Sequence, residues 1–373
     1  MLKKEKISAL QLGMMMHPAI TATAILVVPA ITSHYADRDM WISPIIGSVM
    51  GFITLMIIYL LARRFPNETL IQYSEKILGP LFGKIIGLAY LFFVFHACGI
   101  IIRQYTDFII NSFLPTTPMY VVIGSLVLIS SFAVKGGLEV IGRATQLLIP
   151  LFLVSPLILL LLLTEFKSGN MLPFMENGIK PVLLGAALPQ AWFSEISLVS
   201  MLFPFLTDQK KGLKWGIISM VMVAGFLTFE NMVSVFLFGS STAEYNYPVF
   251  SAFRYISIPP FFEHLDVFIV IVWVIGVFVK LSVFYYIFCL GTTQLLRLSN
   301  YRSIVFPLGV CIVSMSFWVA PSTAELNELF ALTDPFYVTS FMTIIPFVLL
   351  IMAIIRKKKT TLTQRIDKKI LNK

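Results

Sequence analysis

Long apolar stretches recur along this chain, and short polar segments separate them. A helix needs about 20 apolar residues to cross the hydrocarbon core of a bilayer. The pattern therefore predicts an all-α polytopic membrane protein with ten transmembrane helices. These are predicted at residues 8–32, 42–62, 84–111, 118–135, 142–164, 181–206, 213–239, 265–295, 303–320 and 335–355.

The segments between these spans predict the orientation, because cytoplasmic loops carry an excess of Lys and Arg. With the N-terminus inside, the inner segments hold 22 Lys and Arg residues and the outer segments hold four. Both termini are therefore predicted to be cytoplasmic. The longest inner loop, residues 63–83, is amphipathic and predicts a short interfacial helix that ends at Gly79-Pro80.

The composition supports a membrane protein and excludes several other classes. Hydrophobic residues make up 58% of the chain and charged residues only 13%, whereas soluble domains are about 25% charged. No polar block interrupts the apolar pattern, so residues 1–373 are predicted to form one integral membrane domain with a basic cytoplasmic tail at 356–373. The net charge of +9 follows the loops and the tail. It therefore indicates membrane topology and not nucleic-acid binding.

No motif for chemistry accompanies this pattern. The sequence contains no nucleophile motif, no glycine-rich phosphate loop and no His or Cys spacing typical of a metal site. The three cysteines are scattered through apolar runs. The chain is therefore predicted not to be an enzyme, and no cofactor or metal is expected.

Two predicted spans contain matching irregularities. Residues 17–29 are bracketed by Pro18 and Pro29, and residues 188–204 lie between Pro189 and Pro204. Interrupted spans at corresponding positions mark the binding site in transporters built from inverted repeats. Ten spans divide into five and five, which gives repeats at about 8–164 and 181–355. Alternatively, the prolines only kink continuous helices.

Charged residues at membrane depth favour a site. Glu195 lies near the middle of the sixth span, where a carboxylate costs several kcal/mol unless it lines a cavity or has a partner. Lys280 and the pair Ala22–Thr23 lie at a similar depth in their own spans. Two hypotheses for Lys280 remain open: it pairs with Glu195, or it takes the place of a metal cation in a transporter.

Other polar residues in the spans have more local explanations. Arg103 and Asp107 are one helical turn apart and are predicted to form an ion pair. His96 could titrate, although a lone membrane histidine is more often structural. Glu230 and Asn231 lie in the outer half of the seventh span and are predicted to face an aqueous vestibule.

Several short motifs, taken in order and spacing, resemble those of a known family. They are Ala-Thr-Ala-Ile-Leu at 22–26 with Pro29, Phe-Pro-Asn-Glu-Thr-Leu at 65–70, Ser-Glu at 194–195 with Leu-Phe-Pro at 202–204, and Phe-Glu-His-Leu-Asp at 262–266 with Trp273 and Lys280. Over nearly its whole length the chain resembles the endospore germination permeases. These are the B subunits of nutrient germinant receptors and a branch of the amino acid–polyamine–organocation transporters.

The resemblance implies a LeuT-like 5+5 inverted repeat with discontinuous helices 1 and 6. It also implies a small nutrient ligand, typically an L-amino acid, a location in the spore inner membrane, and A- and C-type partner subunits. Relatives commonly have Gly-x-Gly where this chain has Ala22-Thr23-Ala24, and often glycine where it has Ser194. This difference implies either a milder break or a slightly smaller pocket. The residues expected to bind substrate are Thr21, Ala22, Thr23, Ala24, Phe93, Trp192, Phe193, Ser194, Glu195 and Lys280.

These observations together predict a nutrient sensor on a transporter scaffold, in which freed backbone at 21–24 and 193–196 meets the ligand. One alternative is an amino-acid transporter coupled to protons through Glu195 or His96. A further alternative is an ion or water channel subunit whose pore is lined by the polar residues at the midplane.

Overall fold

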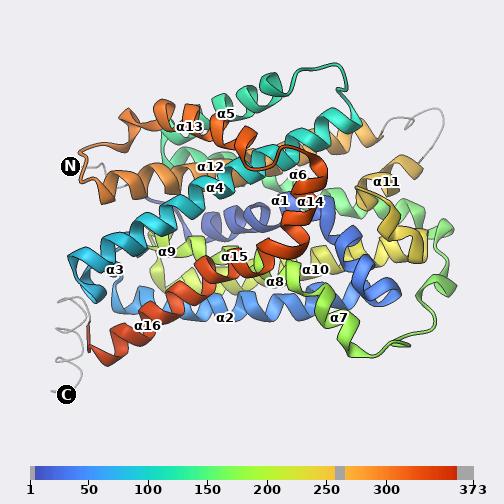
Figure 1. Cartoon of the computed structure of the whole chain (residues 1–373), viewed down its shortest axis with the longest axis horizontal. Helices are drawn as coiled ribbons and strands as arrows, with labels where there is room; N and C mark the ends of the chain where they lie inside the picture. Colours follow the sequence, from blue (N-terminus) through green and yellow to red (C-terminus); the bar gives the residue numbers. More distant parts are fainter. Residues whose placement is uncertain (1–4, 257–264, 359–373) are drawn as a thin grey trace.

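The computed structural model describes residues 5–256 and 265–358 of the 373, and in this part of the chain the fold is helical apart from one isolated β-bridge between Ile7 and Leu206. Long helices lie side by side and form one elongated bundle (Figure 1). The longest are α1 (Ala9–Ala36), α2 (Ser43–Arg64), α4 (Pro80–Ser112), α5 (Met119–Gly136), α6 (Leu138–Val154), α10 (Gly212–Phe238), α12 (Leu265–Leu295) and α13 (Val305–Trp318).

The predicted number of ten spans is not confirmed. Seven helical stretches of the described chain are long and apolar enough to cross a membrane, or eight when one bent pair of helices counts as a span. One of the seven, Ala9–Arg64, contains both α1 and α2, and α13 is shorter than the rest. Each of the ten predicted segments nevertheless contains helix, so the disagreement concerns span length and separation.

The sixth predicted span is broken, as expected. It consists of α7 (Ile179–Gly185), α8 (Ala187–Ser194), the 3₁₀ turn η4 (Glu195–Leu198), α9 (Val199–Leu202) and the 3₁₀ turn η5 (Phe203–Phe205). The axis bends by 41° between α7 and the rest. The regular α-helix therefore changes to a tighter turn at the residue that carries the buried carboxylate.

The first span is not broken, and the predicted discontinuity at residues 21–24 is wrong. Helix α1 continues without interruption through Pro18 and Pro29. A proline removes one backbone donor, and alanine favours helix by about 1 kcal/mol over glycine. Ala22 and Ala24 therefore stabilise a helix where a Gly-x-Gly sequence would weaken it.

The last span is longer and less regular than predicted. It begins at Thr323 rather than at residue 335 and continues to Ile355. Its turns are α14 (Thr323–Glu328), the π-helical η9 (Leu329–Thr333), α15 (Asp334–Thr339), the π-helical η10 (Ser340–Ile344) and α16 (Ile345–Ile355). Two wide turns thus flank α15 in the middle of this span.

The helix predicted in the loop 63–83 is confirmed as α3 (Leu70–Leu78). Thr69 and Gln72 form a capping box at its start, and Gly79, with φ of +92°, ends it. Glycine adopts this backbone conformation without the strain that a Cβ would add. Helix α3 lies at the left end of Figure 1 beside the end of α16, where Arg356 Nη1 donates to the Ile77 carbonyl at 2.7 Å.

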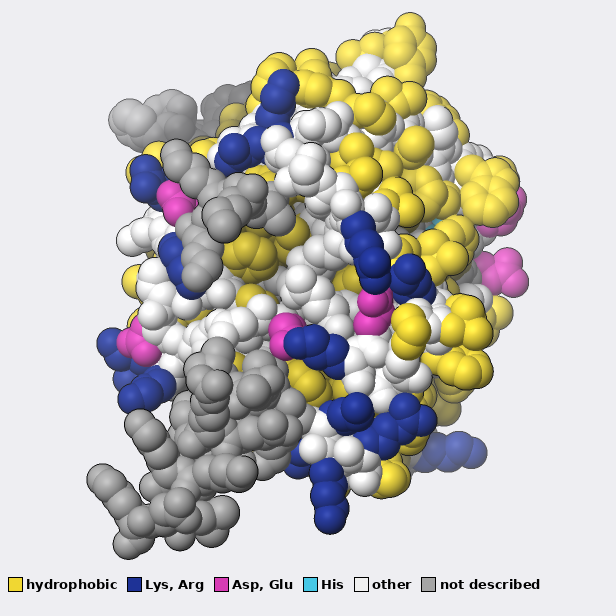
Figure 2. Space-filling view, turned by 90° about the vertical axis from the view of Figure 1, so that its left-hand side faces the viewer, with side chains coloured by type: hydrophobic (Ala, Val, Ile, Leu, Met, Phe, Trp, Pro, Cys, Tyr) yellow, Lys and Arg dark blue, Asp and Glu magenta, His cyan; other side chains and the backbone are white. Residues whose placement is uncertain are grey.

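Several predicted inner segments meet at this same end. The Glu5 carboxylate accepts hydrogen bonds from the Leu138 backbone N–H at 2.8 Å, the Tyr301 hydroxyl at 2.7 Å, Arg302 Nη2 at 3.1 Å and the Tyr286 hydroxyl at 3.2 Å. Figure 2 shows many Lys and Arg side chains across this face. The N-terminal segment is thereby joined to the start of α6 and to the segment between α12 and α13.

Close helix packing positions the broken span. A Cβ on Gly47 of α2 would lie 2.9 Å from the backbone nitrogen of Gln190 in α8, and one on Gly51 would lie 3.0 Å from the Cβ of Phe193. Such distances are shorter than atoms can tolerate. Helix α2 can therefore contact the backbone of α8 only because these two residues lack side chains.

Candidate functional site

A small cavity lies in the bundle between α1, α4, the broken sixth span, α12 and α15. Its volume is about 20 Å³, which is room for about one water molecule. The side chains that line it are Thr23, Phe93, Ala97, Ile100, Ile101, Gln104, Trp192, Glu195, Lys280, Asp334, Tyr337 and Val338.

Lys280 and Glu195 form an ion pair in the wall of this central cavity. Lys280 Nζ donates to Glu195 Oε2 at 2.8 Å and to Thr23 Oγ1 at 3.0 Å. The side chain of Lys280 has no exposed surface and that of Glu195 is 7% exposed. Because an isolated charge at this depth is very unfavourable, each group stabilises the charge of the other. The hypothesis that Lys280 pairs with Glu195 is therefore confirmed.

The turn of the broken span decides which of its side chains reach the cavity. Trp192 and Glu195 are three residues apart, lie on one helical face and both line it. Phe193 instead packs toward Gly51 on α2. The Ser194 hydroxyl donates to the Ala191 carbonyl at 2.5 Å. Phe193 and Ser194, expected to bind substrate, therefore face away from the central cavity.

Of the four α1 residues expected at the site, only Thr23 lines the central cavity. Thr23 lines the cavity, and its carbonyl accepts a hydrogen bond from Gln104 Nε2 of α4 at 3.0 Å. The Thr21 hydroxyl donates to the His17 carbonyl at 2.8 Å within α1. Ala22 lies near Gly276 of α12, and Ala24 is buried without lining the cavity. An unbroken helix presents one face, so Thr21, Ala22 and Ala24 do not join Thr23.

Aromatic rings form much of the remaining wall. The ring of Phe93 lies 5.0 Å from that of Phe341 and 5.1 Å from that of Tyr337, between centroids. The ring of Trp192 lies 5.8 Å from that of Phe330. Phe93 and Trp192, both expected to bind substrate, line the cavity. Each is supported by a ring from the irregular last span.

Asp334 is the main residue that the sequence analysis missed. It is the first residue of α15, only 2% exposed, and it lines the central cavity with Glu195 and Lys280. Its Oδ1 has no hydrogen-bond partner among the described residues. Gln104 was missed as well. The cavity thus brings two carboxylates and one ammonium group together.

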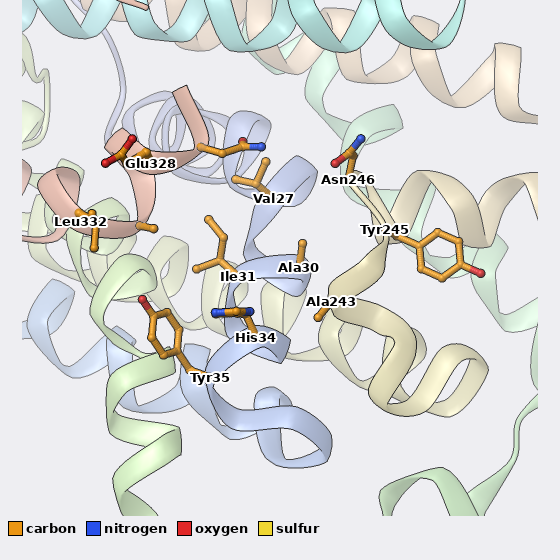
Figure 3. A pocket seen from close by; sticks show the side chains of 12 residues that line it. Val27, Ala30, Ile31, His34, Tyr35, Ala243, Tyr245, Asn246, Glu328 and Leu332 are labelled. Atoms are coloured by element: carbon orange, nitrogen blue, oxygen red, sulfur yellow. The ribbon is translucent and has the colours of Figure 1, made fainter. Parts of the chain in front are cut away.

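Figure 3 shows a second, larger cavity, with a volume of about 410 Å³. Val27, Ile31 and His34 line it from α1, and Glu328 and Leu332 line it from the last span. The figure shows the segment with Ala243 and Asn246 on the opposite side. Val27 is one turn of α1 away from Thr23, and Leu332 is two residues before Asp334. The two cavities therefore follow the same two segments.

Of two further predictions about polar residues in the spans, one is confirmed and the other is wrong. Arg103 Nε lies 3.1 Å from Asp107 Oδ1, so the predicted ion pair is confirmed. Glu230 and Asn231 do not face a vestibule, because they are 1% and 0% exposed. Asn231 Nδ2 donates to Thr32 Oγ1 at 3.1 Å and to the Met40 carbonyl at 2.9 Å. This part of α10 is packed against α1 and the turn that follows α1.

No cluster of three or more His, Cys, Asp or Glu residues that could hold a metal ion occurs among the described residues. The central cavity instead presents a Lys–Glu pair, an unpaired carboxylate, hydroxyl and amide groups, and aromatic rings. Such a combination of polar groups in an apolar wall is typical of a small-molecule site.

Residues 6–324 match the family model described as Spore germination protein. The chain belongs to this family. Spore germination protein KB of Bacillus subtilis (strain 168) is 26% identical over 365 residues, which are 96% of this chain and 97% of that protein. Spore germination protein XB of Bacillus anthracis is 26% identical over 296 residues, 78% of this chain and 81% of that protein.

Solved structures with a similar fold are transporters. A substrate-bound, outward-open Na⁺-coupled sialic acid symporter has a TM-score of 0.64 at 12% identity, over 91% of this chain and 79% of that one. MhsT in complex with L-phenylalanine has a TM-score of 0.62 at 13% identity, over 94% of this chain and 99% of that one. The expected LeuT-like, all-α membrane fold is confirmed.

Proposed function

We propose that this protein is the nutrient-sensing membrane subunit of a spore germination receptor, and that it binds a small nutrient, an L-amino acid, in the central cavity. The observation that carries the proposal is the buried pair Lys280–Glu195, in a cavity bounded by α1 and by the break in the sixth span. Intramembrane charges of this kind mark ligand or ion sites. Thr23, Phe93 and Trp192 complete the wall that meets the ligand.

Sensing follows from the size of the two cavities. A volume of about 20 Å³ is too small for an amino acid, whereas the neighbouring cavity of about 410 Å³ can admit one. A ligand that enters the central cavity must therefore select a more open conformation. The ligand shifts the equilibrium toward this open conformation by as much as its binding free energy differs between the two conformations. This change in conformation is transmitted to the A- and C-type subunits in the spore inner membrane.

The same proposal places both termini in the cytoplasm. It is supported by the meeting of predicted inner segments at one end, where Glu5 contacts Leu138 and Arg302, and by the Lys and Arg side chains on that face (Figure 2). Cytoplasmic loops are enriched in these residues.

A proton-coupled amino-acid transporter is the second candidate, favoured by the likeness to symporters of known structure. Uptake of labelled amino acids into proteoliposomes separates the two. Concentrative uptake by the chain alone supports the transporter and contradicts a pure sensor. The channel alternative requires conductance without ligand, and a cavity of only about 20 Å³ does not favour it.

Direct binding tests the proposal. The purified full chain in lipid nanodiscs is titrated with each of the common L-amino acids, and heat release and thermal unfolding are recorded. At least one amino acid is expected to bind, and Glu195→Gln is expected to weaken its binding. Asp208→Asn, an exposed residue at the inner surface, is the control and leaves binding unchanged. Failure of every amino acid to bind contradicts the proposal.

A further inference from the structure

Asp334 differs from the other charged groups of the central cavity, because its charge is not balanced. Lys280 directs two of its three N–H donors to Glu195 Oε2 and Thr23 Oγ1, at 2.8 and 3.0 Å. Asp334 Oδ1 accepts no hydrogen bond from any described residue, although Asp334 is only 2% exposed. A buried acceptor without a donor costs about 1–3 kcal/mol, and a charged one costs more.

The cavity therefore contains one more acidic side chain than basic side chains. Glu195 and Asp334 contribute two carboxylates, and Lys280 is the one cationic side chain among the described residues that line it. The nearest other cation on α4 is Arg103, which is engaged with Asp107 and with the Pro321 carbonyl. A ligand group with one positive charge and N–H donors would balance the additional carboxylate and supply the hydrogen bond that Asp334 Oδ1 lacks.

The backbone around Asp334 is as unusual as its charge. The residue follows the π-helical turn η9 and precedes Pro335, which has no backbone N–H. Such wide turns are rare and occur frequently at functional sites. The same segment carries Glu328 and Leu332 in the wall of the larger cavity (Figure 3), so one continuous segment contributes to both cavities.

We infer that the Asp334 carboxylate is the receptor for a primary ammonium group, and that the central site recognises its ligand by the amine and not by the carboxylate. The ammonium donates to Asp334 Oδ1. Among the described residues that line the cavity, no cation is free for a ligand carboxylate, because Lys280 is already paired, and α1 is unbroken at residues 21–24. The inference rests on the proposed function only in taking the natural ligand to be an amino acid.

Methylammonium tests Asp334 without assuming the nutrient. The full chain in lipid nanodiscs is titrated with methylammonium chloride, against equal concentrations of sodium chloride, and thermal unfolding and heat release are measured. Methylammonium is expected to bind and stabilise the wild type, and Asp334→Asn is expected to weaken binding at least tenfold. Asp208→Asn, the same change at the inner surface, should leave binding unchanged.

The inference is overturned if methylammonium does not bind, if Asp334→Asn binds it as well as the wild type does, or if sodium gives the same stabilisation. Asparagine is nearly isosteric with aspartate and removes an unpaired charge, so the variant is expected to fold. Should it not fold, a ligand series on the wild type decides. For each amino acid that binds, the carboxamide should bind and the N-acetyl form should not. The opposite pattern overturns the inference.

Failure of this inference is distinct from failure of the proposed function. Methylammonium binding that depends on Asp334, without binding of any amino acid, supports the ammonium site and contradicts the amino-acid sensor. Amino acids that bind equally to the wild type and to Asp334→Asn support the sensor and contradict the role of Asp334.

Discussion

Lys280 Nζ lies 2.8 Å from Glu195 Oε2 in the middle of the bundle, although 84 residues separate the two along the chain. Neither side chain reaches the surface to any extent. The contact joins α12 to the turn η4, where the sixth span changes from α-helix to 3₁₀-helix. One ion pair thus fixes the broken span against the most buried long helix.

Removing one partner of this pair should be more harmful than removing both. Lys280→Met or Glu195→Gln leaves a buried charge without its partner, which costs about 3–5 kcal/mol of the free energy of unfolding. The double variant leaves neither charge and should recover much of this loss. Thermal unfolding of the purified chain measures the three variants.

The exposed pair Lys211–Asp208 provides a matched control. Lys211→Met should change stability by only about 0–1 kcal/mol, because solvent screens exposed ion pairs. Single variants at Lys280 or Glu195 that are as stable as the wild type would contradict a stabilising role for the buried pair.

Charged residues within apolar spans could be identified as site candidates from the sequence alone. Glu195 and Lys280 are charged residues within apolar spans, and counting from the span ends placed them at one depth. Thr23 was found in the same way. Phe193, Ser194, Thr21, Ala22 and Ala24 were expected at the site because a break was expected on both spans. Only the sixth span breaks, so helical geometry selects Thr23, Trp192 and Glu195 and turns their neighbours away.

Asp334 was missed because the start of its span was placed too late. The last span was predicted from the apolar run at residues 335–355, so Asp334 was left just outside it. The helix in fact begins at Thr323 and passes through two π-helical turns, which no apolar periodicity signals. The acid therefore lies at the depth of Glu195 and not at the membrane surface.

The contact of α2 with α8 predicts an effect of a single methyl group. Gly47→Ala places a Cβ at 2.9 Å from the backbone nitrogen of Gln190, so one helix must move. Overpacking of this kind costs about 1–3 kcal/mol. The same displacement moves Trp192, so Gly47→Ala should weaken ligand binding as well as lower the unfolding temperature.

Gly124 on α5 is the matched control, since nothing lies within 4 Å of the Cβ that alanine would add there. Gly124→Ala should be neutral or stabilise the helix by up to about 1 kcal/mol. Equal effects of the two substitutions would show that helix propensity, and not the contact with α8, determines the outcome at Gly47.

The ring contact between Trp192 and Phe330 should limit access from the larger cavity to the central one. Trp192 lines the central cavity, and Phe330 precedes residues 331–332 in the wall of the larger one. Phe330→Ala removes a buried ring at a cost of about 3–5 kcal/mol. It should also make a cysteine at Val338, in the central cavity, react faster with a charged thiol reagent.

The reaction is followed in Val338→Cys with and without Phe330→Ala, in a chain whose exposed Cys311 is replaced by serine. Phe317→Ala, at an exposed ring of α13, is the control and should not change the rate. An unchanged rate in Phe330→Ala would mean that the ligand enters by another path.

Glu5 should stabilise the inner end far more than an ordinary surface acid does. Its side chain is about 10% exposed and accepts hydrogen bonds from α6, from Tyr286 and from the segment with Tyr301 and Arg302. Each Glu5 oxygen faces one group that can only donate, the Leu138 N–H or the Arg302 guanidinium. Glu5→Gln turns one of these oxygens into an NH₂ that cannot accept that bond, which costs about 1–3 kcal/mol.

Glu139, at the start of α6, offers the comparison. Its side chain is 42% exposed and its contacts are with the Lys6 backbone and Arg143. Glu139→Gln should change stability by less than about 1 kcal/mol, because water replaces what is lost. Hydrogen exchange at the start of α6 distinguishes the two variants. Faster exchange of the Leu138 amide in Glu5→Gln alone is expected, because that N–H donates directly to the Glu5 carboxylate. Equal exchange in both variants would mean that the N-terminal segment is held by its backbone bridge at Ile7 and not by Glu5.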